Sequence, residues 1–431
     1  MGKSAMALMK TVGYAGTGRF KNDCIVTLQN RIEKGGIHQV DIYSRGMNIL
    51  KEKGIDYQER QVDLINSTPS ITDAIDLIRK DKQNHWGNGM FDSCIFIPNR
   101  FVTEPLAERN KGTITFGGIK QKVTINQSNN VILHGFGFDD NYAITGIYSD
   151  PALNYASVTA RASFPSGVWF SPLLVTQRIT LWNGVTTREV MVENMGNNLV
   201  PMSVTTHGYF KFHPKQTREG ILLDLPGKKH VRTITQPFIK DSPENLLPDL
   251  SQYPFADFVS NPAYKSLFDG PVSKRFLGDA YFDHCIVGLV PEGVSAFDNA
   301  GTKAILGQYA ARFYQPAVGW GAEVSTPVVK DVPNSVNALQ LYSPPKGAAA
   351  YGCMAFEFQA NVMDALNIQW ADYSLKYANF PSVLNYNTNL FTPGGMRVLF
   401  PFGNGEASMM KHVVRHKMIS EMPMILEMPQ G

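Results

Sequence analysis

The sequence predicts an all-β protein, a large antiparallel β-sandwich with a few short helices. Charged residues make up only 18% of the chain and aromatic residues 11%, a balance that favours sheets over a helical bundle. The 37 glycines and 26 prolines supply many turns. Strand-like segments also follow one another without intervening helical patterns, which indicates antiparallel sheets packed face to face.

Residues 187–192 show the strand pattern clearly, because polar and apolar side chains alternate there as in a half-buried strand. Asn183-Gly184 lies between two such segments, where a hairpin turn is expected. The segments that we expect as strands are 24–28, 38–43, 94–97, 113–116, 122–125, 131–133, 157–163, 173–182, 187–194, 200–212, 280–290, 304–313, 338–342, 351–358 and 397–401.

One helix is expected before residue 90. Ser70 and Asp73 resemble a capping box, and apolar residues follow at helical spacing as far as Ile78, so the helix should end near Lys82. The capping residue and this spacing therefore predict a short amphipathic helix.

We expect three parts along the chain. Residues 1–90 form a mixed segment packed on the sandwich, residues 91–402 form the sandwich itself, and residues 403–431 form a C-terminal tail. The tail is rich in methionine and is interpreted as a helix. Residues 213–275 are rich in proline and are interpreted as a long excursion over the surface.

Charge and hydropathy argue against some partners. The net charge is +3, from 40 Lys and Arg against 37 Asp and Glu, which gives no electrostatic case for nucleic acid. No apolar run approaches the roughly 18 residues of a membrane span, and the apolar patch at residues 5–9 is too short for a signal peptide. A cytoplasmic protein with no membrane partner is expected.

Common cofactor and metal motifs do not fit the chain. Gly13 to Gly18 does not follow dinucleotide or P-loop spacing, and the six-residue separation of His207 and His213 suits no metal turn. We expect neither a cofactor nor a metal site. The four cysteines lie far apart, at positions 24, 94, 285 and 353, and are interpreted as free buried thiols.

Three residues with acid–base chemistry stand out within strand-like segments. His134 ends one apolar segment and His207 lies inside another, although a lone histidine is more often a packing or surface residue. Glu357 lies between Phe356 and Phe358, where a carboxylate is costly to bury unless it is paired. Burial there would raise its pKa toward a value useful for proton transfer.

Six segments, in this order between about residues 90 and 402, resemble the aldose 1-epimerases, or galactose mutarotases. These are Pro98-Asn99-Arg100, Leu133-His134-Gly135, Pro201 to Phe210, Tyr281-Phe282-Asp283-His284, Phe356 to Asn367 and Thr392 to Gly395. The chain departs from the family pattern at Ile95 and Phe96, which replace a Gly-Arg pair, at Ser203, which replaces Asn, and at Met363, which replaces Pro. The resemblance implies the supersandwich fold of that family.

The resemblance also implies an activity, the interconversion of the α and β anomers of a hexose without a redox step or a cofactor. Glu357 would take the proton of the C1 hydroxyl, and His207 would protonate the ring oxygen. The residues implied to bind the sugar are His134, Asp283, Arg100, Asn99, Tyr209 and Gln359. The expected partner is a small-molecule sugar, and the expected state is a monomer or a homodimer.

Other interpretations stay open at this point. The same scaffold could serve as a non-catalytic carbohydrate-binding module, since a fold alone does not fix a reaction. The substrate could also be a phosphorylated or otherwise modified sugar, although a phosphate would favour clustered cations and the matched segments offer Arg100, with Arg397 beyond the closing turn. Asp283 could cap a turn, and Arg100 could be a surface charge.

Overall fold

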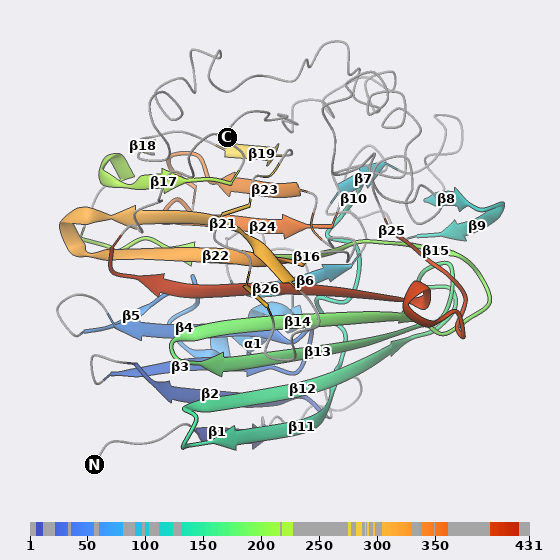
Figure 1. The fold of residues 1–431 in the computed structure, drawn as a ribbon, viewed down its shortest axis with the longest axis horizontal. Helices are drawn as coiled ribbons and strands as arrows, with labels where there is room; N and C mark the ends of the chain where they lie inside the picture. The colour runs from blue at the N-terminus through green and yellow to red at the C-terminus, as the bar shows by residue number, and fades with distance from the viewer. Residues whose placement is uncertain are drawn as a thin grey trace, which may run out of the picture.

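Two antiparallel ten-stranded sheets pack face to face in the computed structural model (Figure 1). It describes residues 6–11, 22–32, 36–55, 60–80, 91–96, 100–102, 112–123, 131–215, 218–226, 275–276, 282–286, 289, 291–292, 296–297, 304–329, 336, 338–348, 350–360 and 397–421. Within these residues the predicted all-β class is confirmed.

The first sheet combines the N-terminal strands with strands from the middle and late parts of the chain. Its order is β1 (Met6–Thr11), β2 (Cys24–Arg31), β3 (Ile37–Tyr43), β4 (Asn48–Ile55), β6 (Asp92–Phe96), β16 (Val204–Lys211), β24 (Cys353–Gln359), β23 (Ala338–Ser343) and β19 (Phe282–Ile286), with β5 (Gln61–Asp63) paired to β4. Strands far apart in sequence therefore lie side by side at its centre.

The second sheet crosses in front of the first in Figure 1. Its order is β11 (Ala143–Asp150), β12 (Tyr155–Phe164), β13 (Leu173–Trp182), β14 (Val185–Asn194), β26 (Met409–Ile419), β22 (Trp320–Val329), β21 (Ala304–Gln315), β17 (Leu222–Asp224) and β18 (Arg275–Phe276), with β20 (Ala296–Phe297) paired to β21. Three short pairs join β7 (Arg100–Val102) to β10 (Val131–Leu133), β15 (Val200–Met202) to β25 (Arg397–Leu399), and β8 (Thr113–Phe116) to β9 (Ile119–Lys122).

Alternation along each strand decides which side chains fill the core. On β24, Met354, Phe356 and Phe358 belong to the main hydrophobic cluster between the sheets. Glu357 and Gln359 occupy the positions between and beyond these core residues, and successive side chains of a strand point to opposite faces. The face of the first sheet that turns away from the second, called the outer face below, is therefore where these polar side chains lie.

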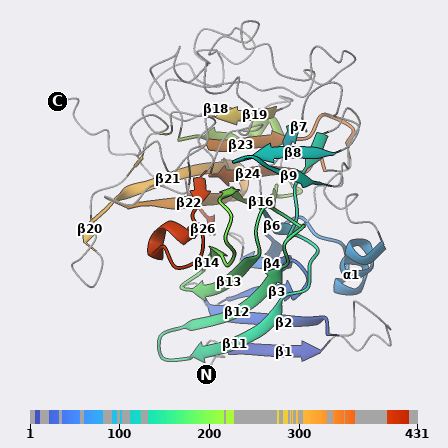
Figure 2. The same ribbon diagram turned by 90° about the vertical axis from the view of Figure 1, so that its right-hand side faces the viewer.

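Helix α1 (Ile71–Lys80) lies outside the sandwich beside β3 and β4 (Figure 2). The Oγ of Ser70 accepts a 3.1 Å hydrogen bond from the backbone N–H of Asp73, which confirms the predicted cap. Ala74, Ile75 and Ile78 are buried against Tyr43 and its neighbours in a small apolar cluster. The helix ends at Lys80, close to the predicted end.

The prediction of a helical tail is wrong, because residues 409–419 form the central strand β26 of the second sheet. Met410 and Val414 are buried in the core while Lys411 is exposed, so the period is that of a strand. Short 3₁₀ turns occur at residues 218–220, 316–318 and 405–408.

Other predicted elements need correction or extension. The strand expected over 200–212 is interrupted at Ser203, which separates β15 from β16. Residues 218–226 of the proline-rich stretch contribute β17 to the second sheet, whereas residues 227–274 lie outside the described residues. Strands β1, β4, β11 and β22 were not predicted.

Two findings concern the expectations about membranes and thiols. Among the described residues, no helix is both long and apolar enough to cross a membrane. Cys24, Cys94 and Cys353 are buried free thiols, as predicted.

Candidate active site

One row of side chains crosses the outer face of the first sheet and contains two of the predicted acid–base residues. His207 on β16 is paired with Ser93 on β6, and Glu357 on β24 is paired with Gln340 on β23. The β16–β24 register, with Thr205 opposite Gln359 and Gly208 opposite Phe356, places His207 opposite Glu357. Residues directly opposite in antiparallel strands share a face, so this register brings the imidazole and the carboxylate together.

The His207 and Glu357 side chains form a buried pair. The imidazole Nε2 lies 3.1 Å from the carboxylate Oε1, and the two side chains are 4% and 1% exposed. A carboxylate in such surroundings is costly unless it is paired, and the imidazole supplies that pairing. An acid and a base at hydrogen-bonding distance are able to exchange protons with a molecule placed against both of them.

His134 brings a second imidazole to the pair. It follows β10 with a φ of 63°, a left-handed conformation that directs the chain away from the strand. Its ring centroid lies 5.3 Å from that of His207, with the ring planes at 89°. The following loop is held to β6, because the N–H of Phe96 donates a 3.2 Å hydrogen bond to the carbonyl of Phe136.

Aromatic side chains border the pair on one side. The ring centroid of Tyr209 lies 4.7 Å from that of His207 and 6.2 Å from that of Tyr342. Tyr209 comes two residues after His207 on the same strand, so its side chain shares the outer face. An aromatic wall of this kind suits the C–H face of a small ring.

Unpaired polar atoms border the pair on the other side. Gln359 is fully buried opposite Thr205, two residues beyond Glu357 on β24. Among the described residues, the amide oxygen and nitrogen of Gln359 and the hydroxyl of Thr205 have no hydrogen-bond partner. Buried polar groups are usually satisfied, so these unpaired atoms distinguish this end of the row from the rest of the face.

Three further predicted site residues are placed only by their backbone or not at all. Arg100 lies in β7 opposite Leu133, the residue that precedes His134. Asp283 lies inside β19 opposite Tyr342, and therefore in a strand rather than in a turn. Asn99 lies outside the described residues.

The sequence prediction missed Ser93, Gln340 and Tyr342 on this face. The signal was present in the alternation of Gln340 and Tyr342 with Leu339 and Leu341, which belong to the core. A polar residue in every second position of an apolar strand marks an outer face that holds other groups. No set of three His, Cys, Asp or Glu side chains within the described residues could hold a metal ion.

Comparison with known proteins identifies the fold. No protein-family model and no curated protein matches the sequence. A solved galactose mutarotase-like protein from Clostridium acetobutylicum superposes with a TM-score of 0.64 at 12% identity, covering 97% of this chain and 99% of the other. Galactose 1-epimerase from Lactobacillus acidophilus gives 0.60 at 15% identity, covering 96% and 99%. An aldose epimerase homologue from C. elegans gives 0.58 at 13% identity, covering 91% and 98%.

The chain therefore has the galactose mutarotase-like fold, and the predicted supersandwich is confirmed. The superpositions establish the fold. Identities of only 12% to 15% do not establish the reaction, which has to be argued from the site.

Proposed function

We propose that the protein is an aldose 1-epimerase that interconverts the α and β anomers of a free hexose. The observation that carries the proposal is the buried pair of His207 and Glu357, 3.1 Å apart, on the outer face of a galactose mutarotase-like sheet. Anomer exchange needs one acid and one base against the same small ring, and this pair supplies both.

In the proposed reaction Glu357 takes the proton from the C1 hydroxyl while His207 gives a proton to the ring oxygen. The bond between C1 and the ring oxygen breaks, leaving an open-chain aldehyde with a hydroxyl at C5. Rotation about the C1–C2 bond presents the other face of the aldehyde. On ring closure the C5 hydroxyl returns its proton to His207, and Glu357 returns its proton to the oxygen at C1. A positioned acid or base typically contributes about 10²–10⁴-fold to such a step.

The neighbours of the pair support a neutral polyhydroxy substrate. Gln359, Thr205 and Gln340 are uncharged hydrogen-bonding groups on the same face, and Tyr209 adds an aromatic wall. A phosphate would instead favour clustered arginine or lysine side chains next to the pair. Hydroxyl groups match these neighbours, so we propose a free hexose rather than a sugar phosphate.

Further sugar contacts are proposed for residues around the pair. His134 would hydrogen-bond near the ring oxygen, since its ring lies against that of His207. Asp283 would accept hydrogen bonds from sugar hydroxyls, and Arg100 and Asn99 would donate to them, as the sequence resemblance implies. The amide of Gln359 would both accept hydrogen bonds from sugar hydroxyls and donate to them.

The test is the rate of mutarotation of freshly dissolved α-D-glucose and α-D-galactose, followed by polarimetry and by NMR of the anomeric protons. The wild-type chain should accelerate exchange, Glu357→Gln should lose most of that gain, and Glu323→Gln should keep it. Glu323 is the matched control because it is also a buried, ion-paired strand carboxylate, placed on the second sheet with Arg312.

Four outcomes contradict the proposal or a part of it. Absence of acceleration by the wild-type chain removes the activity, and equal acceleration by Glu357→Gln removes the assigned base. Sugar binding in calorimetry without exchange identifies a non-catalytic binding protein instead. Faster exchange on glucose 6-phosphate than on glucose overturns the choice of a neutral substrate.

A further inference from the structure

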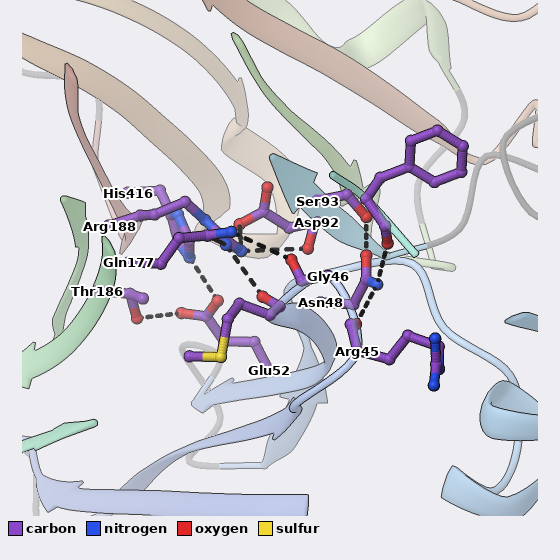
Figure 3. A network of polar contacts seen from close by, with 12 residues as sticks. Arg45, Gly46, Asn48, Glu52, Asp92, Ser93, Gln177, Thr186, Arg188 and His416 are labelled. Atoms are coloured by element: carbon purple, nitrogen blue, oxygen red, sulfur yellow. Dashed lines mark hydrogen bonds and ion pairs between the residues drawn. The ribbon is translucent and has the colours of Figure 1, made fainter. Parts of the chain in front are cut away.

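The row that contains His207 and Glu357 continues beyond Ser93 to Asn48 at the start of β4. The pairing of Ile49 with Asp92 places Asn48 opposite Ser93, and both side chains are fully buried. The hydroxyl of Ser93 donates a hydrogen bond to the Asn48 side-chain oxygen (Figure 3). Asn48 is thus joined through Ser93 to the strand position that pairs with His207.

The side-chain nitrogen of Asn48 reaches two other segments. It donates to the carbonyl of Arg45 at 2.7 Å and to the carbonyl of Phe138 at 2.8 Å. Phe138 belongs to the loop that begins at His134, so one amide group connects β6, the turn before β4 and the loop of the second imidazole. Both amide hydrogens and the amide oxygen of Asn48 are in use.

The same turn fixes the rest of that loop. The guanidinium of Arg45 donates to the carbonyl of Asp139 at 2.7 Å, and the N–H of Gly46 donates to the carbonyl of Asp140 at 2.7 Å. His134 therefore begins a loop whose far end is attached to residues 45–48 through three consecutive carbonyl groups. The turn therefore fixes the far end of the loop that carries the second imidazole.

The core side of the sandwich holds the turn and β6 together as well. Arg188 of the second sheet donates to the carbonyl of Met47 at 3.0 Å, to Gln177 at 2.8 Å and to the carboxylate of Asp92 at 3.1 Å (Figure 3). Arg188 also donates to the carbonyl of Asp92 at 3.2 Å, so it contacts the backbone of the turn and that of β6. On the outer face, the Asn48–Ser93 hydrogen bond joins the His134 loop to the strand that pairs with His207.

We propose that Asn48 and Ser93 are positioning residues that set the distance between His134 and His207 in the proposed reaction. The inference rests on the proposed function. Neither residue is placed against substrate. They act by holding the loop of one imidazole to the strand beside the other, and a misplacement of about 1 Å at a reacting group can cost about 10²-fold in rate.

The first arm of the test measures kcat and KM for anomer exchange in Asn48→Ala, Ser93→Ala and Ser93→Thr. Loss of the Asn48–Ser93 link should lower kcat by about 10-fold or more with little change in KM. Ser93→Thr keeps the hydroxyl and should restore kcat. Thr186→Val is the control, because it removes a buried 2.8 Å hydrogen bond to Glu52 outside the site. It should lose stability and keep kcat.

The second arm does not depend on activity. Histidine-labelled protein should show a nuclear Overhauser effect between the rings of His134 and His207, whose centroids are 5.3 Å apart. The effect should weaken in Asn48→Ala and Ser93→Ala and persist in Ser93→Thr and Thr186→Val. If the wild type fails to exchange anomers, the proposed function fails and this arm still decides the positioning role. Unchanged ring contacts in both alanine variants, or equal loss of kcat in Thr186→Val, overturn it.

Discussion

The imidazole of His207 and the carboxylate of Glu357 lie 3.1 Å apart on neighbouring strands of one sheet, both nearly inaccessible to solvent. Each is placed by register alone, because β16 pairs with β24 over residues on both sides of the contact. The surrounding strand positions alternate between the apolar core and this outer face. A shift of one residue in either strand would send one of the two side chains into the core.

Replacement of His207 by phenylalanine should separate its chemistry from its packing. The variant keeps a ring against Tyr209 and His134 and removes the nitrogen that faces Glu357. We expect a 10²–10⁴-fold loss in the anomer-exchange rate and a loss of about 3–5 kcal/mol in the free energy of unfolding, since one partner of a buried ion pair is removed. Polarimetry and urea unfolding measure the two effects.

The control for that variant is His213→Phe, because His213 is also a buried histidine, packed against Trp320 away from the pair. It should keep the exchange rate. If His207→Phe exchanged anomers as fast as His213→Phe does, His207 would not be the acid.

Two residues of the outer face, Glu357 and His207, could be singled out from the sequence. A glutamate between two phenylalanines is conspicuous because a buried carboxylate is costly unless it is paired, and the histidine gains weight only once that glutamate is admitted. Helix α1 was also predictable, since its cap and its apolar spacing are both local signals. These signals act within a few residues of one another.

The pairing of strands could not be predicted in the same way. Ser93, His207 and Gln340 join one row only after β6, β16 and β23 are placed in order, and those contacts are long-range. Strand β4 was missed because its Lys-Glu-Lys-Gly run has low β-propensity. In β26, methionine and basic residues, which are good helix formers, hid a period of two.

Gln359→Met should change stability and sugar binding in opposite directions. The amide of Gln359 is fully buried without a hydrogen-bond partner among the described residues, so an apolar side chain of similar shape should leave the free energy of unfolding unchanged or raise it by about 1 kcal/mol. The KM for the hexose should rise by about 10-fold, because a hydrogen bond to a sugar hydroxyl is lost. Urea unfolding and exchange kinetics on one preparation measure both.

Gln177→Met is the matched comparison. The Gln177 amide oxygen accepts a 2.8 Å hydrogen bond from buried Arg188, so its loss should destabilise the protein and leave KM unchanged. Equal destabilisation by the two substitutions would show that the Gln359 amide is satisfied in the folded protein.

Gly46→Ala should disturb the loop of His134. Gly46 has a φ of +67°, and a Cβ atom there would lie 1.9 Å from the carbonyl oxygen of Phe138. Backbone strain of about 1–2 kcal/mol is expected at such a φ, and displacement of the loop should add to it. We expect a lower melting temperature together with slower anomer exchange.

Gly117→Ala separates the cost of backbone strain from the cost of displacing the His134 loop. Gly117 has a φ of +56° and open space where the Cβ would stand, so it carries the backbone strain alone. A melting temperature lowered equally by the two alanine substitutions would mean that the contact with Phe138 is relieved without consequence.

The buried network around Glu52 should make stability depend on pH. Glu52 accepts hydrogen bonds from His38 at 2.7 Å, from His416 at 2.5 Å and from Thr186 at 2.8 Å. Burial acts to raise the carboxyl pKa, but His416 and His38 hold the pKa of Glu52 well below its usual range. Burial acts to lower the imidazole pKa, but the Glu52 carboxylate outweighs it and raises the pKa of His416 above 6.5.

The two pKa shifts make the stability of the fold change with pH in opposite directions. The contribution of Glu52 is complete above its ordinary pKa of about 4.3 and is lost as the pH falls through its lowered value. The contribution of His416 is complete below about 6.5 and is lost as the pH rises through its raised value. The pair should therefore stabilise the fold most between about pH 4.5 and 6.5, and less at higher pH.

Urea unfolding of the wild type and Glu52→Gln between pH 4.5 and 9 measures this contribution. The variant should be less stable by about 3–5 kcal/mol near pH 6, because it leaves a buried imidazolium without its carboxylate. The difference in unfolding free energy should narrow as the pH rises through the raised pKa of His416, because the imidazole then loses its charge and an amide can accept hydrogen bonds from neutral imidazoles. A gap that widened toward pH 9 would assign the stabilising role of Glu52 to hydrogen bonding with neutral partners instead.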